Sequence, residues 1–240
     1  MPYFTTEDKQ FFRENGYVVK HNTVSDRLIK KAIDVIWPHI DADRNDPGTW
    51  VNAGPSGNLP CTSHPDVRSL LHDGPHVDMA EELVGEGTLE ISNDPFCKMI
   101  YPTGEDDWSL PEKGHMDGYT IEGVVSTFTL GITMNLNDVV HRAGGFTLWP
   151  GTHLMAAEYI KTHSILNGME AYTNPLPQPV EIFGSAGTTC FWHHYMMHSA
   201  SKNCGSEIRM ATVSRLRRKD VNDIMFETPD NMWEYWNGIE

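Results

Sequence analysis

Apolar and polar positions follow two different periods along the chain, and the change falls near residue 85. Up to that point apolar residues recur every three or four positions, which is the spacing of amphipathic helices. From about residue 88 onward, short runs rich in β-branched and aromatic residues take over, and this is typical of strands. The pattern predicts a helical N-terminal cover over about 1–85 and a β-rich core over about 86–218.

Three helices and one short strand are predicted in the N-terminal part. Thr5 and Asp8 have the spacing of a capping box, and Gly16 provides the stop, after which a strand begins. Ser25 caps a longer helix, and a shorter helix ends at Gly85. The residues expected on the core side of the first two helices are Phe11, Phe12, Leu28, Ile29, Ala32, Ile33, Ile36 and Trp37.

The β-rich part divides into short strands separated by turn residues. Over 127–137, Thr and Asn alternate with apolar residues, so one face of that strand is polar and faces either an enclosed site or solvent. Helices followed by many short strands favour a mainly β jelly roll with helical cover, in one domain. The predicted strands are 88–92, 96–101, 121–137, 145–149, 180–183, 187–194 and 207–217.

Composition and charge exclude several classes of protein. A chain of 240 residues with 39% hydrophobic content can bury one core. It has neither an 18-residue apolar run nor the start of a signal peptide, so we expect a cytoplasmic protein with no membrane partner. The net charge of −15 argues against nucleic acid and against polyanionic substrates. The one basic cluster is expected to be a solvated strand end, although it could bind a phosphate; it comprises Arg215, Arg217, Arg218 and Lys219.

The last segment, 219–240, is acidic and aromatic. Residues 220–240 contain six acidic residues and no Lys or Arg, together with Trp233, Tyr235 and Trp236. Aromatic residues at this density predict docking on the body of the protein or on a second subunit, as in a homodimer.

Candidate chemistry begins with the segment His115-Met116-Asp117 and with His198. On an extended segment residues i and i+2 point to the same side, so His115 and Asp117 can face one metal ion. Gly114 and Gly118 on either side permit a tight backbone. Two histidines and one carboxylate can occupy one face of an octahedral Fe(II) ion, which leaves three positions open for a co-substrate and dioxygen.

Arg209 supplies a cation that the metal ligands lack. His198 ends one predicted strand and Arg209 lies on the next, so adjacent antiparallel strands would bring the two together. A guanidinium grips a carboxylate with two parallel hydrogen bonds. The set therefore predicts an oxygenase that uses Fe(II), O2 and 2-oxoglutarate. His193 and His194 are rival ligands, but the spacing of eleven residues to Arg209 favours His198.

Four segments of the chain resemble the phytanoyl-CoA dioxygenase family of 2-oxoglutarate oxygenases, and they extend to about residue 217. They are Gly16-Tyr-Val-Val, His115-x-Asp117, Gly144-Gly-Phe-Thr-Leu-Trp-Pro-Gly-Thr-His153 and Gly187-x10-His198-x4-Asn203-x5-Arg209. The resemblance implies a double-stranded β-helix, or cupin-like barrel. It also implies that His115, Asp117 and His198 bind iron and that Arg209 binds the distal carboxylate of 2-oxoglutarate.

The chain departs from the family pattern beside the co-substrate. Ala200 stands where the family often has a serine, with Ser199 and Ser201 on either side. Thr133 and Asn135 stand on the strand where the family tends to have an aromatic residue, and Thr133 is our candidate for a co-substrate contact.

Three further residues are candidates for pocket contacts. The long loop 102–114 leads directly into His115 and is typical of a lid. Trp108 on that loop and Tyr119 beyond Asp117 are candidates for the wall of a substrate pocket. Lys98 could reach a carboxylate, but a solvated surface lysine is the simpler expectation.

These residues together predict a dioxygenase that hydroxylates or otherwise oxidises a small-molecule metabolite, with release of succinate and carbon dioxide. Two alternatives use the same ligands. One is a non-oxidative, cupin-like isomerase that holds Zn, Mn or Ni, and the other is a catalytically silent metal-binding barrel. The isomerase would not need an arginine eleven residues after the metal histidine, and the intact set of metal ligands weighs against the silent barrel. The sequence leaves the substrate unidentified.

Overall fold

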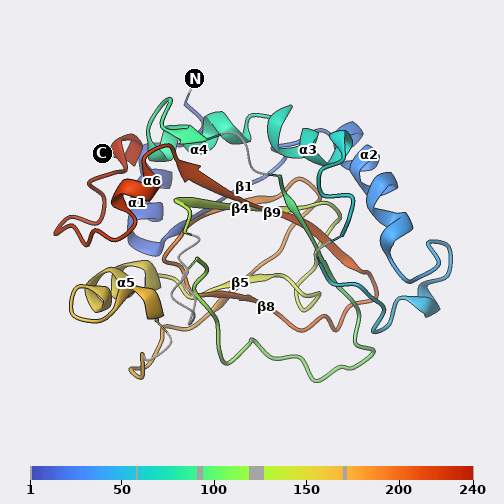
Figure 1. Ribbon diagram of the computed structural model, residues 1–240. Helices are drawn as coiled ribbons and strands as arrows, with labels where there is room; N and C mark the ends of the chain where they lie inside the picture. The colour runs from blue at the N-terminus through green and yellow to red at the C-terminus, as the bar shows by residue number, and fades with distance from the viewer. Residues whose placement is uncertain (1, 58, 91–93, 119–126, 170–171, 240) are drawn as a thin grey trace.

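Two antiparallel sheets face each other in the computed structural model, which describes residues 2–57, 59–90, 94–118, 127–169 and 172–239 (Figure 1). The larger sheet has the order β1-β7-β4-β9-β2, with β3 also paired to β9, and the smaller has the order β6-β5-β8. This arrangement is a double-stranded β-helix, as predicted. The strands are β1 Tyr17–Lys20, β2 Leu89–Glu90, β3 Phe96–Ile100, β4 Leu130–Asn135, β5 Phe146–Leu148, β6 Val180–Ile182, β7 Thr189–His193, β8 His198–Ala200 and β9 Arg209–Arg218.

Helices cover the outer face of the larger sheet, while α5 lies beside the smaller one (Figure 1). The helices are α1 Thr6–Asn15, α2 Asp26–Ile36, α3 Pro65–His72, α4 His76–Val84, α5 Thr152–Ile160 and α6 Val221–Ile224. Short 3-10 turns lie at Trp37–His39, Pro47–Thr49, Ile165–Asn167 and Asn237–Ile239. No helix in the described part of the chain has the length and apolar character needed to cross a bilayer.

Strand β4 shows how the alternation of residue types separates the two layers. Its apolar residues Leu130, Ile132 and Met134 are buried in the clusters that the helices complete. The residues between them face the space between the sheets, where the Thr133 hydroxyl accepts a hydrogen bond from the Trp192 indole. The polar face therefore lies inside the barrel rather than in solvent, which decides between the two readings of the sequence.

The capping box at the first helix is confirmed, because Thr5 and Asp8 each accept a hydrogen bond from the other's backbone N–H. Gly16 ends α1 with a φ of 82°. Phe11 was expected in the core but is 41% exposed, whereas Phe12 is fully buried. Phe12 is the one buried residue of α1.

Two regions differ from the predicted elements. Helix α3 was not predicted, although Pro65 at its first position and the His64 side chain, which accepts from the Asp66 N–H, are start signals. The strand predicted over 121–137 is observed only from Leu130, and residues 119–126 lie outside the described part.

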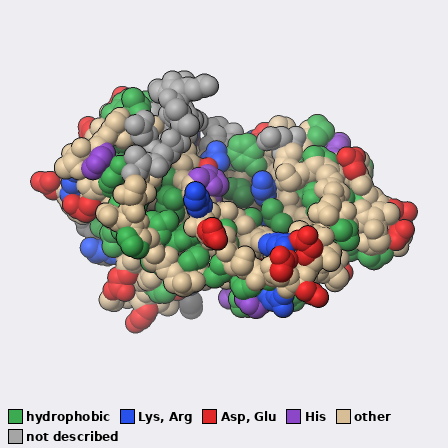
Figure 2. Space-filling model, turned by 90° about the horizontal axis from the view of Figure 1, so that it is seen from below, with side chains coloured by type: hydrophobic (Ala, Val, Ile, Leu, Met, Phe, Trp, Pro, Cys, Tyr) green, Lys and Arg blue, Asp and Glu red, His purple; other side chains and the backbone are tan. Residues whose placement is uncertain are grey.

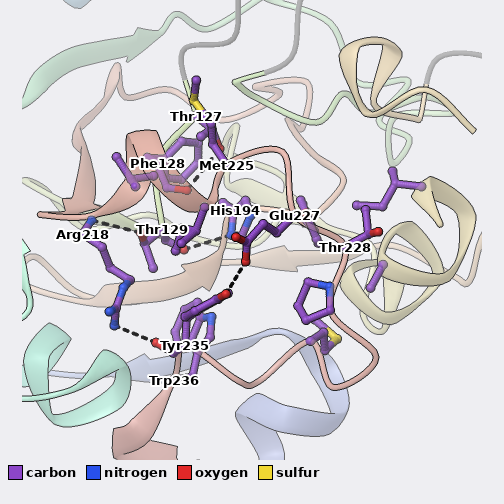
Figure 3. Close-up of a pocket in the computed structure, with 17 residues that line it drawn as sticks. Thr127, Phe128, Thr129, His194, Arg218, Met225, Glu227, Thr228, Tyr235 and Trp236 are labelled. Atoms are coloured by element: carbon purple, nitrogen blue, oxygen red, sulfur yellow. Dashed lines mark hydrogen bonds between the residues drawn. The ribbon is translucent and has the colours of Figure 1, made fainter.

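The C-terminal segment docks on the body of the protein. Trp236 is 2% exposed and packs against Phe12 of α1, with ring centroids 5.4 Å apart. The Arg218 guanidinium donates to the Tyr235 carbonyl, and the His194 ring donates to the Thr129 carbonyl beside a cavity of about 70 Å³ (Figure 3). Trp236 therefore docks on the protein's own body, and contact of this segment with a second subunit stays a prediction.

Candidate active site

A short antiparallel contact brings the first two candidate ligands together. His115 and His198 exchange backbone hydrogen bonds of 3.0 Å in both directions, so the segment after the long loop lies alongside β8. Gly114 allows this approach, because a Cβ at that position would come within 2.6 Å of the Trp149 ring and 3.0 Å of the His198 carbonyl oxygen. Gly118 has a φ of 91°, a backbone conformation that favours glycine.

The Asp117 carboxylate lies between the two imidazoles. Its Oδ1 is 3.2 Å from Nε2 of His115, and its Oδ2 is 3.3 Å from Nε2 of His198. One ligand atom from each of the three residues lies within 4.8 Å of the others, which is the spacing of a metal site. We call this group, His115, Asp117 and His198, the metal cluster.

Two further contacts prepare the metal cluster for a cation. His198 Nδ1 donates to the Met196 carbonyl at 3.0 Å, so Nε2 is the ring nitrogen that faces Asp117 and the site. Burial raises the pKa of the Asp117 carboxyl, but hydrogen bonds from His115 and His198 and the nearby charge of Arg215 outweigh it and hold the pKa well below its usual range. The carboxylate is therefore ionised at neutral pH, as a metal ligand must be.

The metal cluster lies on the wall of a cavity of about 560 Å³. On the face seen in Figure 2 the surface is hollowed, with apolar side chains inside and histidine and basic side chains at the edge. The His115 side chain is 62% exposed, whereas those of Asp117 and His198 are 12% and 8% exposed. A volume of this size suits a small organic molecule.

Arg209 lines the same cavity and is 2% exposed. Its Nε and Nη2 atoms have no hydrogen-bond partner among the described residues. Burial lowers the pKa of the guanidinium to about 10, and the charge of Glu181 opposes that shift, so the group stays protonated. A buried cation without a partner is costly, and an anion entering the cavity would relieve that cost.

A second buried donor lies on the same inner face. The Asn135 amide nitrogen also lacks a partner among the described residues. Asn135 is paired in register with Ala211, two residues from Arg209 along β9. In the sequence, Asn135 stood out only as a departure from the family pattern. The region around Arg209 thus offers donors that suit an oxygen-rich ligand.

His198 and Arg209 lie on opposite sheets, so the prediction that they occupy adjacent strands is wrong. His198 begins β8 in the smaller sheet, and Arg209 begins β9 in the larger sheet, where it pairs with Ile100. The two residues nevertheless line one cavity, because the chain crosses between the sheets within eleven residues.

Asn203 holds the crossover together. It is fully buried, and its side-chain amide donates to the carbonyls of Ile100 and Glu207 at 2.8 and 2.9 Å. Its Oδ1 accepts from the Gly205 N–H at 2.9 Å. The Asn203 side chain therefore fixes the path between His198 and Arg209.

Two of the remaining candidates, Thr133 and Trp108, are not among the residues that line this cavity. Thr133 is buried beside Trp192, which itself is a lining residue. Trp108 packs edge-on against His141 at 4.7 Å between ring centroids, away from the lining residues. Tyr119 falls outside the described residues.

Two departures from the family pattern receive a structural explanation. Ser199 and Ala200 line the cavity, while the Ser201 hydroxyl is hydrogen-bonded to Thr147 at 2.7 Å. An aromatic wall comes from β7 instead of β4, since the Trp192 indole lies 4.5 Å from the His198 ring between centroids. Gly131 makes room for it, because a Cβ there would be 2.1 Å from the indole.

Two further basic residues line the cavity. Lys98 is exposed, as expected of a surface lysine, and it also lines the cavity. Arg215, expected to belong to a solvated strand end, hydrogen-bonds Asp117. The sequence contained a signal for Arg215, because residues 209, 211, 213 and 215 share one face of a strand.

The rival histidines belong to a separate group. His193, His194 and His153 lie close together under Trp233 and Trp236, with ring centroids of His193 and His194 4.4 Å apart and stacked. We call His153, His193 and His194 the packed histidine cluster. No carboxylate joins these three rings into a metal site among the described residues.

No family model matches the chain, and no curated protein matches it. Solved structures do. SnoN, a non-haem alpha-ketoglutarate-dependent epimerase from nogalamycin biosynthesis, is 21% identical, with a TM-score of 0.61 over 88% of this chain and 82% of its own. The carbocyclase SnoK from the same biosynthesis is 18% identical, with a TM-score of 0.61 and coverages of 94% and 92%. EctD from S. alaskensis with bound Fe is 15% identical, with a TM-score of 0.61 and coverages of 98% and 84%.

Identities of this size establish a shared fold. Membership of the phytanoyl-CoA dioxygenase family rests on the sequence motifs and stays a prediction.

Proposed function

We propose that the protein is an Fe(II)- and 2-oxoglutarate-dependent oxygenase that acts on a small-molecule metabolite in the cytoplasm. One observation carries the proposal: the metal cluster and the buried, unpaired cation of Arg209 line a single cavity. Two imidazoles and one carboxylate suit a ferrous ion, and a guanidinium suits the far carboxylate of a keto diacid. The dependence of SnoN and SnoK on alpha-ketoglutarate supports it.

Each residue then has a defined role. His115, Asp117 and His198 would hold the iron, and Arg209 would bind the distal carboxylate of 2-oxoglutarate, with Asn135 as a further donor beside it. When bound, Fe(II) and 2-oxoglutarate together supply an oxidant made from dioxygen, with release of succinate and carbon dioxide. The Met196 carbonyl fixes the tautomer of His198, and Trp192 and Phe146 provide an apolar wall that limits water.

Hydroxylation is the outcome that we propose for the substrate. Other outcomes use the same site, and the fold is shared with an epimerase and a carbocyclase. A metabolite panel incubated with the Fe(II) protein, 2-oxoglutarate and air separates them by mass. Hydroxylation adds one oxygen atom, ring closure or desaturation removes two hydrogen atoms, and epimerisation leaves the mass unchanged.

The test of the class itself needs no substrate. The anaerobic Fe(II) protein is titrated with 2-oxoglutarate, and we expect the visible charge-transfer band of the chelated keto acid. Admission of air should then give slow, uncoupled formation of succinate. An isomerase barrel would bind metal without this band, and a silent barrel would form no succinate; either result overturns the proposal.

A further inference from the structure

Arg209 is the first residue of β9, and the ends of a strand open more easily than its interior. Its guanidinium is buried, and the Nε and Nη2 atoms have no hydrogen-bond partner among the described residues. A charged group in this state is more stable in water, so the side chain would turn outward if the backbone of Arg209 were free to move. The position of Arg209 in the cavity therefore depends on contacts that hold the start of β9.

Strand β3 holds one edge of this backbone. Ile100, the last residue of β3, is paired in register with Arg209. The Asn203 amide donates to the Ile100 carbonyl at 2.8 Å and so holds the same end of β3. On this side, Arg209 is part of a regular strand pair.

Strand β4, on the other side, stops before it reaches Arg209. Strands β4 and β9 run side by side (Figure 1), and the last pair of their ladder joins Asn135 to Ala211. If the same register is continued by two residues on each strand, Asn137 comes opposite Arg209. Asn137 lies beyond the end of β4, however. The ladder between the two backbones therefore ends short of Arg209.

The side chain of Asn137 takes the place of the missing strand residue. Its Nδ2 donates to the Ile208 carbonyl at 2.9 Å, and its Oδ1 accepts from the Met210 N–H at 2.8 Å. A carboxamide carries a donor and an acceptor as a peptide unit does, so this one side chain bonds the backbone both before and after Arg209. The start of β9 is thus held from both sides.

We propose that Asn137 is a positioning residue of the co-substrate site, which keeps the Arg209 guanidinium in the cavity, where it can bind the distal carboxylate of 2-oxoglutarate. Asn137 is not among the described residues that line the cavity, so it acts through Arg209 and does not touch the co-substrate. Asn135 differs in this respect, because its amide nitrogen has no partner among the described residues and can bind a ligand directly. The inference rests on the proposed function, because it takes Arg209 as the anchor of 2-oxoglutarate.

The experiment compares two keto acids that differ only at the far end of the molecule, 2-oxoglutarate and 2-oxopentanoate. Both can chelate iron through a keto oxygen and a carboxylate, but only 2-oxoglutarate has a second carboxylate for Arg209. The anaerobic Fe(II) protein is titrated with each acid, and the charge-transfer band gives the two dissociation constants. Asn137→Ala should weaken 2-oxoglutarate about tenfold or more, because a displaced guanidinium loses the geometry of its paired hydrogen bonds. The dissociation constant of 2-oxopentanoate should change by less than about twofold, since no distal contact is lost.

A second comparison tests whether Asn137 acts through Arg209. In the Arg209→Ala protein the guanidinium is already absent, so the addition of Asn137→Ala should weaken 2-oxoglutarate by less than about a further twofold. Asn137→Gln keeps both hydrogen-bonding groups on a side chain that is longer by one methylene, and its preference for 2-oxoglutarate should lie between those of the parent and of Asn137→Ala. Asn137→Gln also carries both comparisons if Asn137→Ala does not fold, as judged from its melting temperature and iron content.

Asp138→Ala is the matched control. Asp138 follows Asn137 directly, and its Oδ1 accepts from the Ala186 N–H at 2.8 Å, so it holds the chain that leads into β7 and not the start of β9. This variant should lower the melting temperature and leave the dissociation constants of both keto acids unchanged.

Three results would overturn the inference while leaving the proposed function intact. Asn137→Ala could weaken both keto acids equally, which would indicate a general loss of structure, or it could leave both unchanged. The third is an effect on 2-oxoglutarate that is as large in the Arg209→Ala protein as in the parent. Failure of the proposed function has a different signature, because the parent protein would then show no charge-transfer band with either acid.

Discussion

The metal cluster and the packed histidine cluster use almost the same side chains in opposite ways. In the metal cluster the ring nitrogens of His115 and His198 point at a carboxylate on the wall of a cavity. In the packed cluster the rings lie against aromatic residues, and the His153 ring donates to the Arg13 carbonyl at 3.0 Å. Burial lowers the pKa of His153 to about 4 and of His194 to about 3.

This difference distinguishes a candidate functional site, the metal cluster, from a structural group, the packed histidine cluster. Both groups contain histidines whose rings are about 4.4 Å apart, so proximity of imidazoles does not distinguish them. The distinguishing features are an ionised carboxylate between the rings and an unpaired cation across the cavity. Each of the following predictions removes one of these features or tests its absence.

The largest effect is expected from the metal ligands. His115→Ala, Asp117→Ala and His198→Ala should each abolish stoichiometric Fe(II) binding, because two remaining ligands do not make a tight facial site. Iron content after anaerobic loading and desalting is the measurement. His193→Ala and His194→Ala are the matched controls and should keep iron while lowering the melting temperature. Full iron occupancy in His198→Ala, together with loss in either control, would reverse the assignment of the two clusters.

The next effect concerns the cation. Loss of one partner of a buried, charged pair costs about 3–5 kcal/mol, so Arg209→Ala should weaken 2-oxoglutarate binding about a hundredfold or more. Iron affinity should be unchanged, and Arg209→Lys should be intermediate because it keeps the charge without the fork. Titration of the charge-transfer band with 2-oxoglutarate gives the dissociation constant of 2-oxoglutarate, and titration with Fe(II) gives that of iron. Arg217→Ala on the same strand, where Arg217 bonds Asn222, is the control. A parental titration curve for Arg209→Ala would show that another group anchors the co-substrate.

The smallest effect is the response of the packed histidine cluster to acid. The folded-state pKa of His153 lies near 4, below the 6.5 of an ordinary histidine, so the unfolded chain takes up protons first as pH falls below 6.5. The stability present at neutral pH should be lost between pH 6.5 and 4, by about 2 kcal/mol for this histidine at pH 5. Urea unfolding at stepped pH measures the slope. His153→Gln should flatten the slope, whereas the exposed His163→Gln should not; equal slopes in all three proteins would contradict the assignment.

The elements of the fold were predictable where local signals agreed. The capping box at Thr5 and the alternation around Ile132 act within a few residues, and both lead to the observed elements. The assignment of strands to sheets was not predictable, because β8 pairs with β5 from far along the chain. Because the strands of His198 and Arg209 follow each other in the sequence, we expected them to pair, but they lie in different sheets.

His115 and Asp117 could be named because a carboxylate two positions from a histidine is a local pattern, whereas His198 was chosen among rival histidines by its spacing to Arg209. Lys98 could not be named, because its place in the cavity depends on which face of β3 turns inward. Arg215 shares a strand face with Arg209, so alternation along β9 contained a signal for it. Thr133 faces the interior of the barrel, where Trp192 from the neighbouring strand donates to it, and Trp192 rather than Thr133 lines the cavity. This contact depends on the size of a side chain from another strand, which the sequence of one strand does not reveal.

The hydrogen bonds of Asn203 give the connection between the sheets a fixed length. Its amide donates to the Ile100 carbonyl at the end of β3 and to the Glu207 carbonyl four residues further along the connection. These two hydrogen bonds fix the conformation of the backbone between Asn203 and Glu207. Most surface connections tolerate an inserted residue, but one added here would shift Arg209 to the opposite face of its strand, since side chains alternate along a strand. The segment between His198 and Arg209 is therefore a poor place for tags or grafted loops. Homologues that share this chemistry should vary in length elsewhere.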